Sequence, residues 1–398
     1  RQVAFDNFLD MESIGQLERQ SRILDLLQAH LIHVFTWRKI FGKLLVVRNA
    51  SAGHDAAQVQ IFAQLLPCVV QTTAEAHAAV KREIAKVIVG QDRVIELLLI
   101  ALFSRGHCLF VGVPGLAKTR AIKALAKNLE ADFSRIQFTP DLLPSDVTGT
   151  EVYNQGASGG EFRFEPGPIF ANIVLGDEIN RAPAKVQAAM LEAMEERQVT
   201  VAGTTHRMPA LFMVMATQNP VEQEGTYPLP EAQMDRFLMH VNIEYTPVED
   251  EVRIIELVRS EENASHDAAS KPAQEDAARI PQEAVFDARR EIGAIKVSDA
   301  VQRYMADLVY ATRTPDKYSE DLDRWIEVGG SPRASLALDK CSRTHAWLAG
   351  RDYVDPGDVR AIAHNVPRHR LMLSYEAQGE GVAADQVIDA LIEAVALP

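Results

Sequence analysis

The sequence predicts a parallel α/β domain followed by a helical domain. Short, continuously apolar segments alternate with segments of helical periodicity. The apolar segments stop after residue 247, and the helical segments continue. Continuous apolar runs are typical of strands buried on both faces of a parallel sheet. The predicted strands are residues 107–111, 133–138, 172–176, 211–217 and 238–245. Because parallel strands end at one edge of a sheet, we expect ligands to bind at their carboxyl ends.

Length and composition indicate two or three globular domains without a membrane span. The chain has 398 residues, with a hydrophobic fraction of 47% and a charged fraction of 24%. Its longest apolar runs are shorter than the roughly 20 residues that a helix needs to cross a bilayer. The net charge of −14 argues against nucleic acid as the main ligand, because binding phosphates needs a basic face. The widely spaced Cys68, Cys108 and Cys341 indicate neither disulfides nor a zinc site, so we expect a cytoplasmic protein.

Three domains follow from the distribution of these patterns. Residues 1–73 form a predicted N-terminal extension of uncertain structure, in which no signal peptide is recognisable. Within it, residues 26–47 are apolar and basic. They suit an amphipathic helix for a partner or a membrane surface, although a poorly structured extension is the simpler interpretation. The predicted α/β core spans residues 74–247, and a predicted helical domain spans residues 248–398.

The segments between and after the strands also carry signals. In the core we expect helices at residues 76–87, 93–104, 120–129, 185–197 and 231–237, a turn at residues 89–92, an insertion or hairpin at residues 139–170, and a β-hairpin at residues 198–208. In the helical domain we expect helices at residues 249–259, 299–311, 332–348, 356–366 and 385–396, with a polar linker at residues 263–276.

The segment GVPGLAKT, residues 112–119, lies between the first predicted strand and a predicted helix. A glycine-rich turn at such a position places backbone N–H groups around a phosphate at the positive end of the helix. Lys118 can then reach the β- and γ-phosphate oxygens, and the hydroxyl of Thr119 can bind Mg²⁺. Ala117 replaces the second glycine that is usual in such loops. An ordinary glycine-rich turn is the alternative interpretation.

Polar residues at the ends of two later strands fit the same chemistry. Asp177 and Glu178 follow an apolar strand, where the first carboxylate can hold the water shell of Mg²⁺ and the second can polarise an attacking water. Asn219 follows the next strand and can hold that water or the γ-phosphate. A solvated turn or helix cap is the alternative for the acidic pair, and a plain Asn-Pro turn is the alternative for Asn219.

Two arginines lie at helix ends and suit contacts with a γ-phosphate. Arg236 is near the end of the predicted helix at residues 231–237, and Arg333 is in the first turn of the helix that begins within GGSPRAS. A guanidinium group matches phosphate oxygens and neutralises the charge of the transition state. Exposed surface charges are the alternative interpretation.

Together these motifs resemble the MoxR family of AAA+ ATPases. The similar segments are GVPGLAKT, VLGDEINRAP, MLEAMEERQVT, ATQNPVEQEGTYPLPEAQMDRF and GGSPRAS, within a region from about residue 74 to residue 398. Ala117 is usual in that family. The resemblance implies an AAA+ P-loop core with a helix-2 insert at residues 139–170 and a pre-sensor-1 hairpin at residues 198–208, followed by an all-α lid domain.

The resemblance also implies roles for matching residues. Lys118 and Thr119 match Walker A, Asp177 and Glu178 match Walker B, Asn219 matches sensor 1, Arg236 the arginine finger and Arg333 sensor 2. The implied catalytic residues are Glu178, Asn219, Arg236 and Arg333, and the implied Mg²⁺ residues are Thr119 and Asp177. The implied ATP-binding residues are Val89, Gly90 and Gln91 around the adenine, with Gly112, Val113, Pro114, Gly115, Leu116, Ala117, Lys118, Thr119 and Arg120 around the phosphates.

Family members form rings, commonly hexamers, that remodel client proteins, often beside a protein with a von Willebrand factor A domain. The resemblance therefore implies an ATP-hydrolysing, chaperone-like remodeller that assembles, activates or inserts a cofactor into client complexes. A nucleotide-gated scaffold with little hydrolysis and a DNA-acting motor are the alternatives. We expect the lid domain to close over the nucleotide through Arg333, rotating at the junction of residues 246 and 247, and Arg236 to act on a neighbouring chain.

Overall fold

The structure is a computed structural model that describes residues 92–112, 118–156, 159–219, 226–243, 245, 247–267 and 279–397. The chain divides between Val69 and Val70 into two compact units, and all described residues belong to the second unit. The predicted N-terminal extension, the predicted helix at residues 76–87 and the turn residues 89–91 lie outside the described residues.

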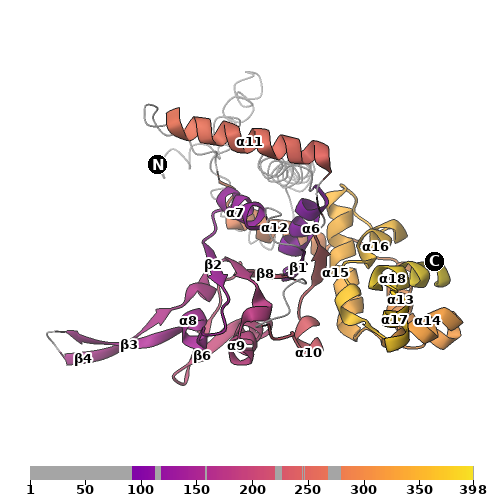
Figure 1. Ribbon diagram of the computed structural model, residues 1–398, viewed down its shortest axis with the longest axis horizontal. Coiled ribbons are helices and arrows are strands. Elements are labelled where there is room, and N and C mark those ends of the chain that lie inside the picture. Colours follow the sequence, from indigo (N-terminus) through magenta and orange to yellow (C-terminus); the bar gives the residue numbers. More distant parts are fainter. Residues whose placement is uncertain are drawn as a thin grey trace, which may run out of the picture. The chain divides into compact units, whose positions relative to one another are not determined.

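A parallel sheet of five strands forms the centre of this unit and confirms the predicted fold class (Figure 1). Its order is β2-β5-β8-β1-β9, and every neighbouring pair is parallel. The strands are β1 (Cys108–Val111), β2 (Phe133–Gln137), β5 (Ile173–Asp177), β8 (Met213–Gln218) and β9 (Met239–Asn242). Each lies within one or two residues of a predicted strand, except that β9 ends three residues before the predicted end.

Helices cover both faces of the sheet. Helices α6 (Asp92–Phe103) and α7 (Lys118–Asn128) pack with Cys108 and Phe110 of β1 in one hydrophobic cluster. Helices α8 (Pro144–Thr148) and α9 (Ala184–Glu196) pack with Leu109 in a second cluster. Successive residues of a strand point to opposite faces, so a strand buried on both faces has to be apolar throughout.

Two β-hairpins extend from this core, as the sequence predicts. Strands β3 (Gly149–Gly156) and β4 (Gly159–Pro166) form the insert between β2 and β5. Strands β6 (Gln198–Val201) and β7 (Thr204–Arg207) follow α9, and their two-residue turn has positive φ angles at Ala202 and Gly203, as a type I′ turn requires. The rings of Phe164 and His206 stack at 3.8 Å and join the two hairpins.

The region after β9 is mainly helical. Its helices are α11 (Val248–Asp267), α12 (Gln282–Gly293), α13 (Asp299–Ala311), α14 (Glu320–Trp325), α15 (Pro332–Leu348), α16 (Pro356–Ala363), α17 (Tyr375–Glu380) and α18 (Ala384–Ala394). The expected bounds of α13 and α15 are confirmed. None of the described helices is long and apolar enough to span a membrane.

Three predictions for this region were wrong. Residues 263–267, predicted as linker, continue α11 although four of the five are weak helix formers, because extending a helix that has already formed adds one hydrogen bond per residue without a new nucleation cost. Helices α12, α14 and α17 were missed. The strand signals do not stop after residue 247, since β10 (Ile326–Val328) pairs with β11 (Met372–Leu373); strands this short carry no readable alternation. In the core, before β9, the short α10 (Glu231–Met234) ends three residues before the predicted end at residue 237.

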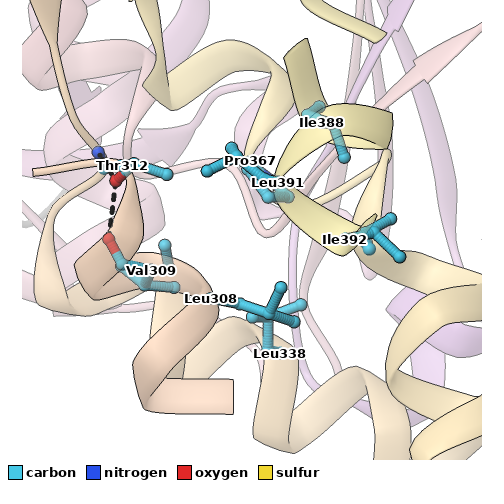
Figure 2. A pocket seen from close by; sticks show the side chains of 11 residues that line it. Leu308, Val309, Thr312, Leu338, Pro367, Ile388, Leu391 and Ile392 are labelled. Atoms are coloured by element: carbon cyan, nitrogen blue, oxygen red, sulfur yellow. Dashed lines mark hydrogen bonds between the residues drawn. The ribbon is translucent and has the colours of Figure 1, made fainter. Parts of the chain in front are cut away.

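The helical region has an apolar interior of its own. Leu308, Leu338, Ile388 and Leu391 converge from three helices around a small cavity, which Figure 2 shows from close by. The hydroxyl of Thr312, at the cavity wall, donates a hydrogen bond to the carbonyl oxygen of Val309 at 2.6 Å. The cavity of about 20 Å³ holds no more than about one water molecule and is therefore a packing defect rather than a ligand site.

The helical region is attached to β9, the outermost strand of the sheet, by hydrogen bonds and an ion pair. The backbone N–H of His240 donates to the carbonyl oxygen of Asn365 at 2.8 Å, and Arg368 Nη1 donates to the carbonyl oxygen of His240 at 3.0 Å. Arg370, whose side chain is only 3% exposed, pairs with Asp235 at 2.7 Å and donates to the carbonyl oxygen of Phe237 at 2.6 Å. The buried charge is thus fully used in holding the two parts together.

We expect Arg370→Met to lower the free energy of unfolding by about 3–5 kcal/mol, because it leaves the half-buried carboxylate of Asp235 without this cation. Urea denaturation followed by circular dichroism would measure the change. Arg253→Met is the control, since Arg253 pairs with Asp250 on the exposed surface of α11 and should hardly affect stability. A loss for Arg370→Met no larger than that of the control would refute the role of this pair.

Candidate functional site

The carboxyl ends of three neighbouring strands bring the predicted acidic and amide residues to one edge of the sheet. Asp177 is the last residue of β5, Glu178 follows it, and Asn219 directly follows β8. Gly112 follows β1, which pairs with β8 in parallel. The structure therefore brings Gly112, Asp177, Glu178 and Asn219 together at this carboxyl edge.

Two side chains hold the carboxylate of Asp177. The hydroxyl of Thr217 donates to Oδ1 at 2.7 Å, and Nη2 of Arg135 lies 2.6 Å from Oδ2. Thr217 lies in β8 and Arg135 in β2, the strands on either side of β5. The two neighbouring strands thus fix the position of this carboxylate from opposite sides.

Glu178 is held through both its backbone and its side chain. Its backbone is in the left-handed region with φ of 58°, which is strained for a residue with a Cβ atom. The N–H of Glu178 donates to the hydroxyl oxygen of Thr217 at 2.9 Å. Its carboxylate accepts a hydrogen bond from Gln137 at 3.1 Å and lies 3.2 Å from Nε of Arg181. The hydroxyl of Thr217 therefore links both acidic residues.

The start of the phosphate loop requires glycine for a steric reason. A Cβ atom at Gly112 would lie 2.5 Å from the carbonyl oxygen of Ile243, which is closer than such atoms approach. Helix α7 begins at Lys118, so a strand precedes and a helix follows the predicted phosphate loop, in the order that such a loop needs. The predicted residues Val89, Gly90, Gln91 and Val113, Pro114, Gly115, Leu116, Ala117, and the side chains of Lys118, Thr119 and Arg120, lie outside the described residues.

The residues present at this edge fit a Mg²⁺–nucleotide. Carboxylate oxygens such as those of Asp177 are ligands that Mg²⁺ prefers, directly or through water. The beginning of α7 supplies N–H groups and a positive helix end for phosphates. The buried Asn219, with 7% exposure, adds a neutral amide beside them.

Arg236 and Arg333 meet at a different place. Nε of Arg236 lies 2.8 Å from Oε2 of Glu195, and Arg333 pairs with Oε1 of the same carboxylate. Arg236 follows α10, and Arg333 is in the first turn of α15, where the Ser331 side chain caps the helix. Glu195 is in the last turn of α9. One carboxylate therefore binds two arginines that are far apart in the sequence.

The contacts of His107 place this pair of arginines at the amino edge of the sheet. His107 directly precedes β1, and the N–H of Val214 donates to its Nδ1 at 2.9 Å. Its Nε2–H therefore donates to the carbonyl oxygen of Met194, beside Glu195, at 3.2 Å. Burial lowers the pKa of His107 to about 3, so the ring stays neutral in this bond. Within a single chain, Arg236 and Arg333 thus lie at the amino ends of the strands, whereas Asp177 and Glu178 lie at the carboxyl ends.

Sequence reasoning missed four residues of these sites: Arg135, Gln137, Thr217 and Glu195. Arg135 and Gln137 alternate with the buried Ile136 in β2, a pattern that marks a polar strand face near the carboxyl edge. Thr217 is a polar residue in an otherwise apolar strand, and this was a usable signal. Glu195 lies within the motif MLEAMEERQVT, but no sequence signal pairs it with Arg333, which is 138 positions away.

Comparisons with known proteins agree with this arrangement. Residues 107–239 match the family described as "ATPase family associated with various cellular activities (AAA)", and residues 321–391 match the AAA lid domain. A crystal structure from Cytophaga hutchinsonii has a TM-score of 0.76 at 39% sequence identity, covering 85% of this chain and 99% of that chain.

Two relatives have similar lengths as well as similar sequences. Chaperone MoxR1 of Mycobacterium tuberculosis is 46% identical over 318 residues, which are 79% of this chain and 81% of the relative. Protein MoxR of Methylorubrum extorquens is 34% identical over 347 residues, which are 81% of this chain and 96% of the relative. With the AAA core, the lid domain and this identity over most of both chains, the protein belongs to the MoxR family of AAA+ ATPases.

Proposed function

We propose that the protein is an ATP-hydrolysing, chaperone-like remodeller that works as a ring, in which each nucleotide bound by one chain is completed by two arginines of its neighbour. The observation that carries the proposal is the separation of the acidic pair from Arg236 and Arg333. A complete constellation for hydrolysis requires both sets near one γ-phosphate. Two copies joined at opposite edges of their sheets would supply it.

At the carboxyl edge, the residues of one chain bind the nucleotide and orient water. Bound Mg²⁺–ATP would supply the phosphoanhydride bond and neutralise part of the phosphate charge. Lys118 contacts the phosphate oxygens, and Thr119 and Asp177 hold the metal. Glu178 polarises the attacking water, and Asn219 positions it through a neutral hydrogen bond.

At the amino edge, Arg236 and Arg333 contact the neighbour's γ-phosphate. Glu195 pairs with both arginines in the isolated chain and offsets only one of their two charges, so an approaching phosphate, which carries more negative charge, replaces this carboxylate as their partner. The sequence suggested instead that Arg333 closes the lid domain over its own nucleotide. We replace that hypothesis, because Arg333 contacts Glu195 at the edge away from its own Asp177.

The work on clients and the choice of partner extend this proposal. The relative called Chaperone MoxR1 supports a chaperone activity. The β3–β4 hairpin exposes Tyr153 and Phe162, whose apolar rings suit contact with a client protein. We propose a hexameric ring in the cytoplasm, assisted by a protein with a von Willebrand factor A domain, as the family resemblance implies.

A nucleotide-gated scaffold with little hydrolysis is the second candidate. It is favoured by the contacts of Asp177 with Arg135 and of Glu178 with Gln137, which occupy both carboxylates. A phosphate-release assay on assembled protein separates the two functions. Turnover typical of AAA+ ATPases supports the remodeller, and nucleotide binding without release of phosphate supports the scaffold.

We expect Lys118→Ala to abolish nucleotide binding and Glu178→Gln to keep ATP bound but not hydrolysed. Lysine contributes charge to the phosphates in the ground state, whereas glutamate acts mainly on the attacking water. Binding of a fluorescent ATP analogue and release of phosphate would be measured on both variants. Equal loss of ATP affinity in two correctly folded variants would contradict the assigned roles.

Hydrolysis should depend on assembly, with Arg236 acting on the neighbour. An arginine supplied by a second chain contributes about 10³–10⁵ in rate, so activity per chain should rise steeply with protein concentration. Arg236→Ala and Glu178→Gln should each be inactive alone. Mixed, they should regain activity, because some interfaces pair an intact arginine with an intact glutamate. No recovery in mixed rings, verified by mass measurement, would place Arg236 outside the neighbour's site.

Thr217 should be a positioning residue for hydrolysis. Thr217→Val keeps the shape but removes the hydroxyl that binds Asp177 and Glu178. Losing about 1.5 kcal/mol of orientation corresponds to about a tenfold lower kcat. Thr217→Ser retains the hydroxyl and should restore most of the activity. If both variants show the same kcat, the hydrogen bonds of Thr217 do not position the acidic pair.

A further inference from the structure

A large cavity opens at the amino edge of the sheet, between the ends of α6 and α9 and the helices α12 and α15. Its volume of about 700 Å³ is in the range of ligand sites. Two carboxylates, those of Glu195 and Asp235, line it. Eight cationic side chains also line it: Arg105, Arg197, Arg236, Arg289, Arg333, Lys340, Arg343 and Arg370. The cavity is thus strongly basic in a chain whose net charge is −14.

Carboxylates neutralise one part of this lining. Glu195 pairs with Arg236 and Arg333, and Asp235 pairs with Arg370. Arg343, a further member, pairs with Asp339 of its own helix. These arginines are accounted for by the proposed contact with a neighbour and by the attachment of the lid domain.

The other part of the lining, which consists of Lys340 and three arginines, has no carboxylate partner among the residues that the structure describes. We name Arg105, Arg197 and Arg289 the inner arginines. Among the residues that the structure describes, no carboxylate lies within ion-pair distance of any of the three. Nη1 of Arg197 is buried and has no hydrogen-bond partner in that part of the chain. A buried guanidinium nitrogen without an acceptor is costly and marks a place for one.

Capping of helix α6 accounts for only a fraction of this charge. Nη2 of Arg289 donates to the carbonyl oxygen of Leu102 at 2.7 Å, and Nη2 of Arg197 donates to the carbonyl oxygen of Arg105 at 3.2 Å. These carbonyl groups lie at the end of α6, and a helix C-terminus carries only about half a negative charge. Three full positive charges exceed what it can neutralise.

Burial and the charges of neighbouring arginines lower the pKa of two of these groups. Burial, followed by the charge of Arg105, lowers the pKa of Arg197 to about 10. Burial, followed by the charges of Arg197 and Arg105, lowers the pKa of Arg289 to about 10. Arg197 and Arg289 therefore remain charged at neutral pH, and the charges of the three neighbouring arginines repel one another, so a multivalent anion would relieve the repulsion.

We propose that the inner arginines form a binding site for a phosphate-type polyanion, separate from the phosphate loop. Planar guanidinium groups bind phosphate oxygens through paired hydrogen bonds, and the cavity is wide enough for a di- or triphosphate. The polyanion has two sources: a free polyphosphate, or the phosphates of a nucleotide carried by a neighbouring chain. Only the second source rests on the proposed ring.

Pyrophosphate is the probe for the free source, and isothermal titration calorimetry is the measurement. The full chain would carry Lys118→Ala, so that the phosphate loop does not compete. We expect Arg197→Gln combined with Arg289→Gln to weaken pyrophosphate binding at least tenfold at constant ionic strength. Arg253→Gln, which removes an exposed arginine of α11 that is not part of the cavity lining, is the control and should leave binding unchanged.

Arg105→Gln is a second test variant. Because Arg105 is exposed, its substitution should not disturb folding. It should also weaken pyrophosphate binding while the melting temperature stays the same. To test the neighbour's nucleotide as the source, ATP affinity would be measured for the Glu178→Gln protein, both as assembled rings and as dilute single chains. Each measurement would be repeated on protein that also carries Arg197→Gln and Arg289→Gln. A loss of ATP affinity in rings alone identifies the neighbour as the source.

Pyrophosphate binding by dilute single chains identifies the free ion as the source, and this result does not depend on ATP hydrolysis. The proposal is overturned if folded variants bind pyrophosphate as the parent does and the rings hold ATP with unchanged affinity. Equal weakening by Arg253→Gln would also overturn it, since binding would then reflect net charge alone.

Discussion

The parallel direction of the five strands is the constraint on which the rest of the structure depends. It places every carboxyl end at one edge of the sheet, so Asp177 of β5 and Asn219 after β8 become neighbours although they are far apart in the sequence. It also places the segment before each strand at the other edge. Arg236, which precedes β9, therefore lies away from the acidic pair of its own chain. The proposed division of the site between copies rests on this geometry.

Glu195 supplies a partner for Arg236 and Arg333 when no neighbouring chain is present. In the isolated chain its single carboxylate pairs with both Arg236 and Arg333 and offsets one of their two positive charges. Partly exposed ion pairs of this kind contribute little to stability, which makes them easy to exchange for a phosphate with more charge and more acceptor oxygens. The inner arginines differ, because no carboxylate among the described residues pairs with them. The same cavity thus contains one set of arginines that pairs with carboxylates and one set that pairs with no described carboxylate.

The sequence was sufficient for the sheet and for the residues at its carboxyl edge, for a physical reason. Strands buried on both faces must be apolar throughout, as in β5 and β8, and phosphate chemistry restricts the residues that follow them. The residues that hold the site could not be predicted so readily. Arg135 reaches Asp177 from a neighbouring strand, and Glu195 meets Arg333 only after the chain has folded. Contacts of this kind leave no local periodicity.

The attachment of the lid domain limits how the protein can move. Leu98 of α6 and Leu338 of α15 belong to one continuous hydrophobic cluster, and Arg370 is buried against the segment that carries Arg236. Rotating the lid domain away from its own core would expose this cluster and separate a buried charge from Asp235, at a cost of several kcal/mol. The surfaces that carry the acidic pair and the arginines are by comparison polar and partly exposed. In the proposed ring, movement during a nucleotide cycle would therefore cost less free energy between copies than within one, and Arg333 would report on the neighbour's nucleotide rather than on its own.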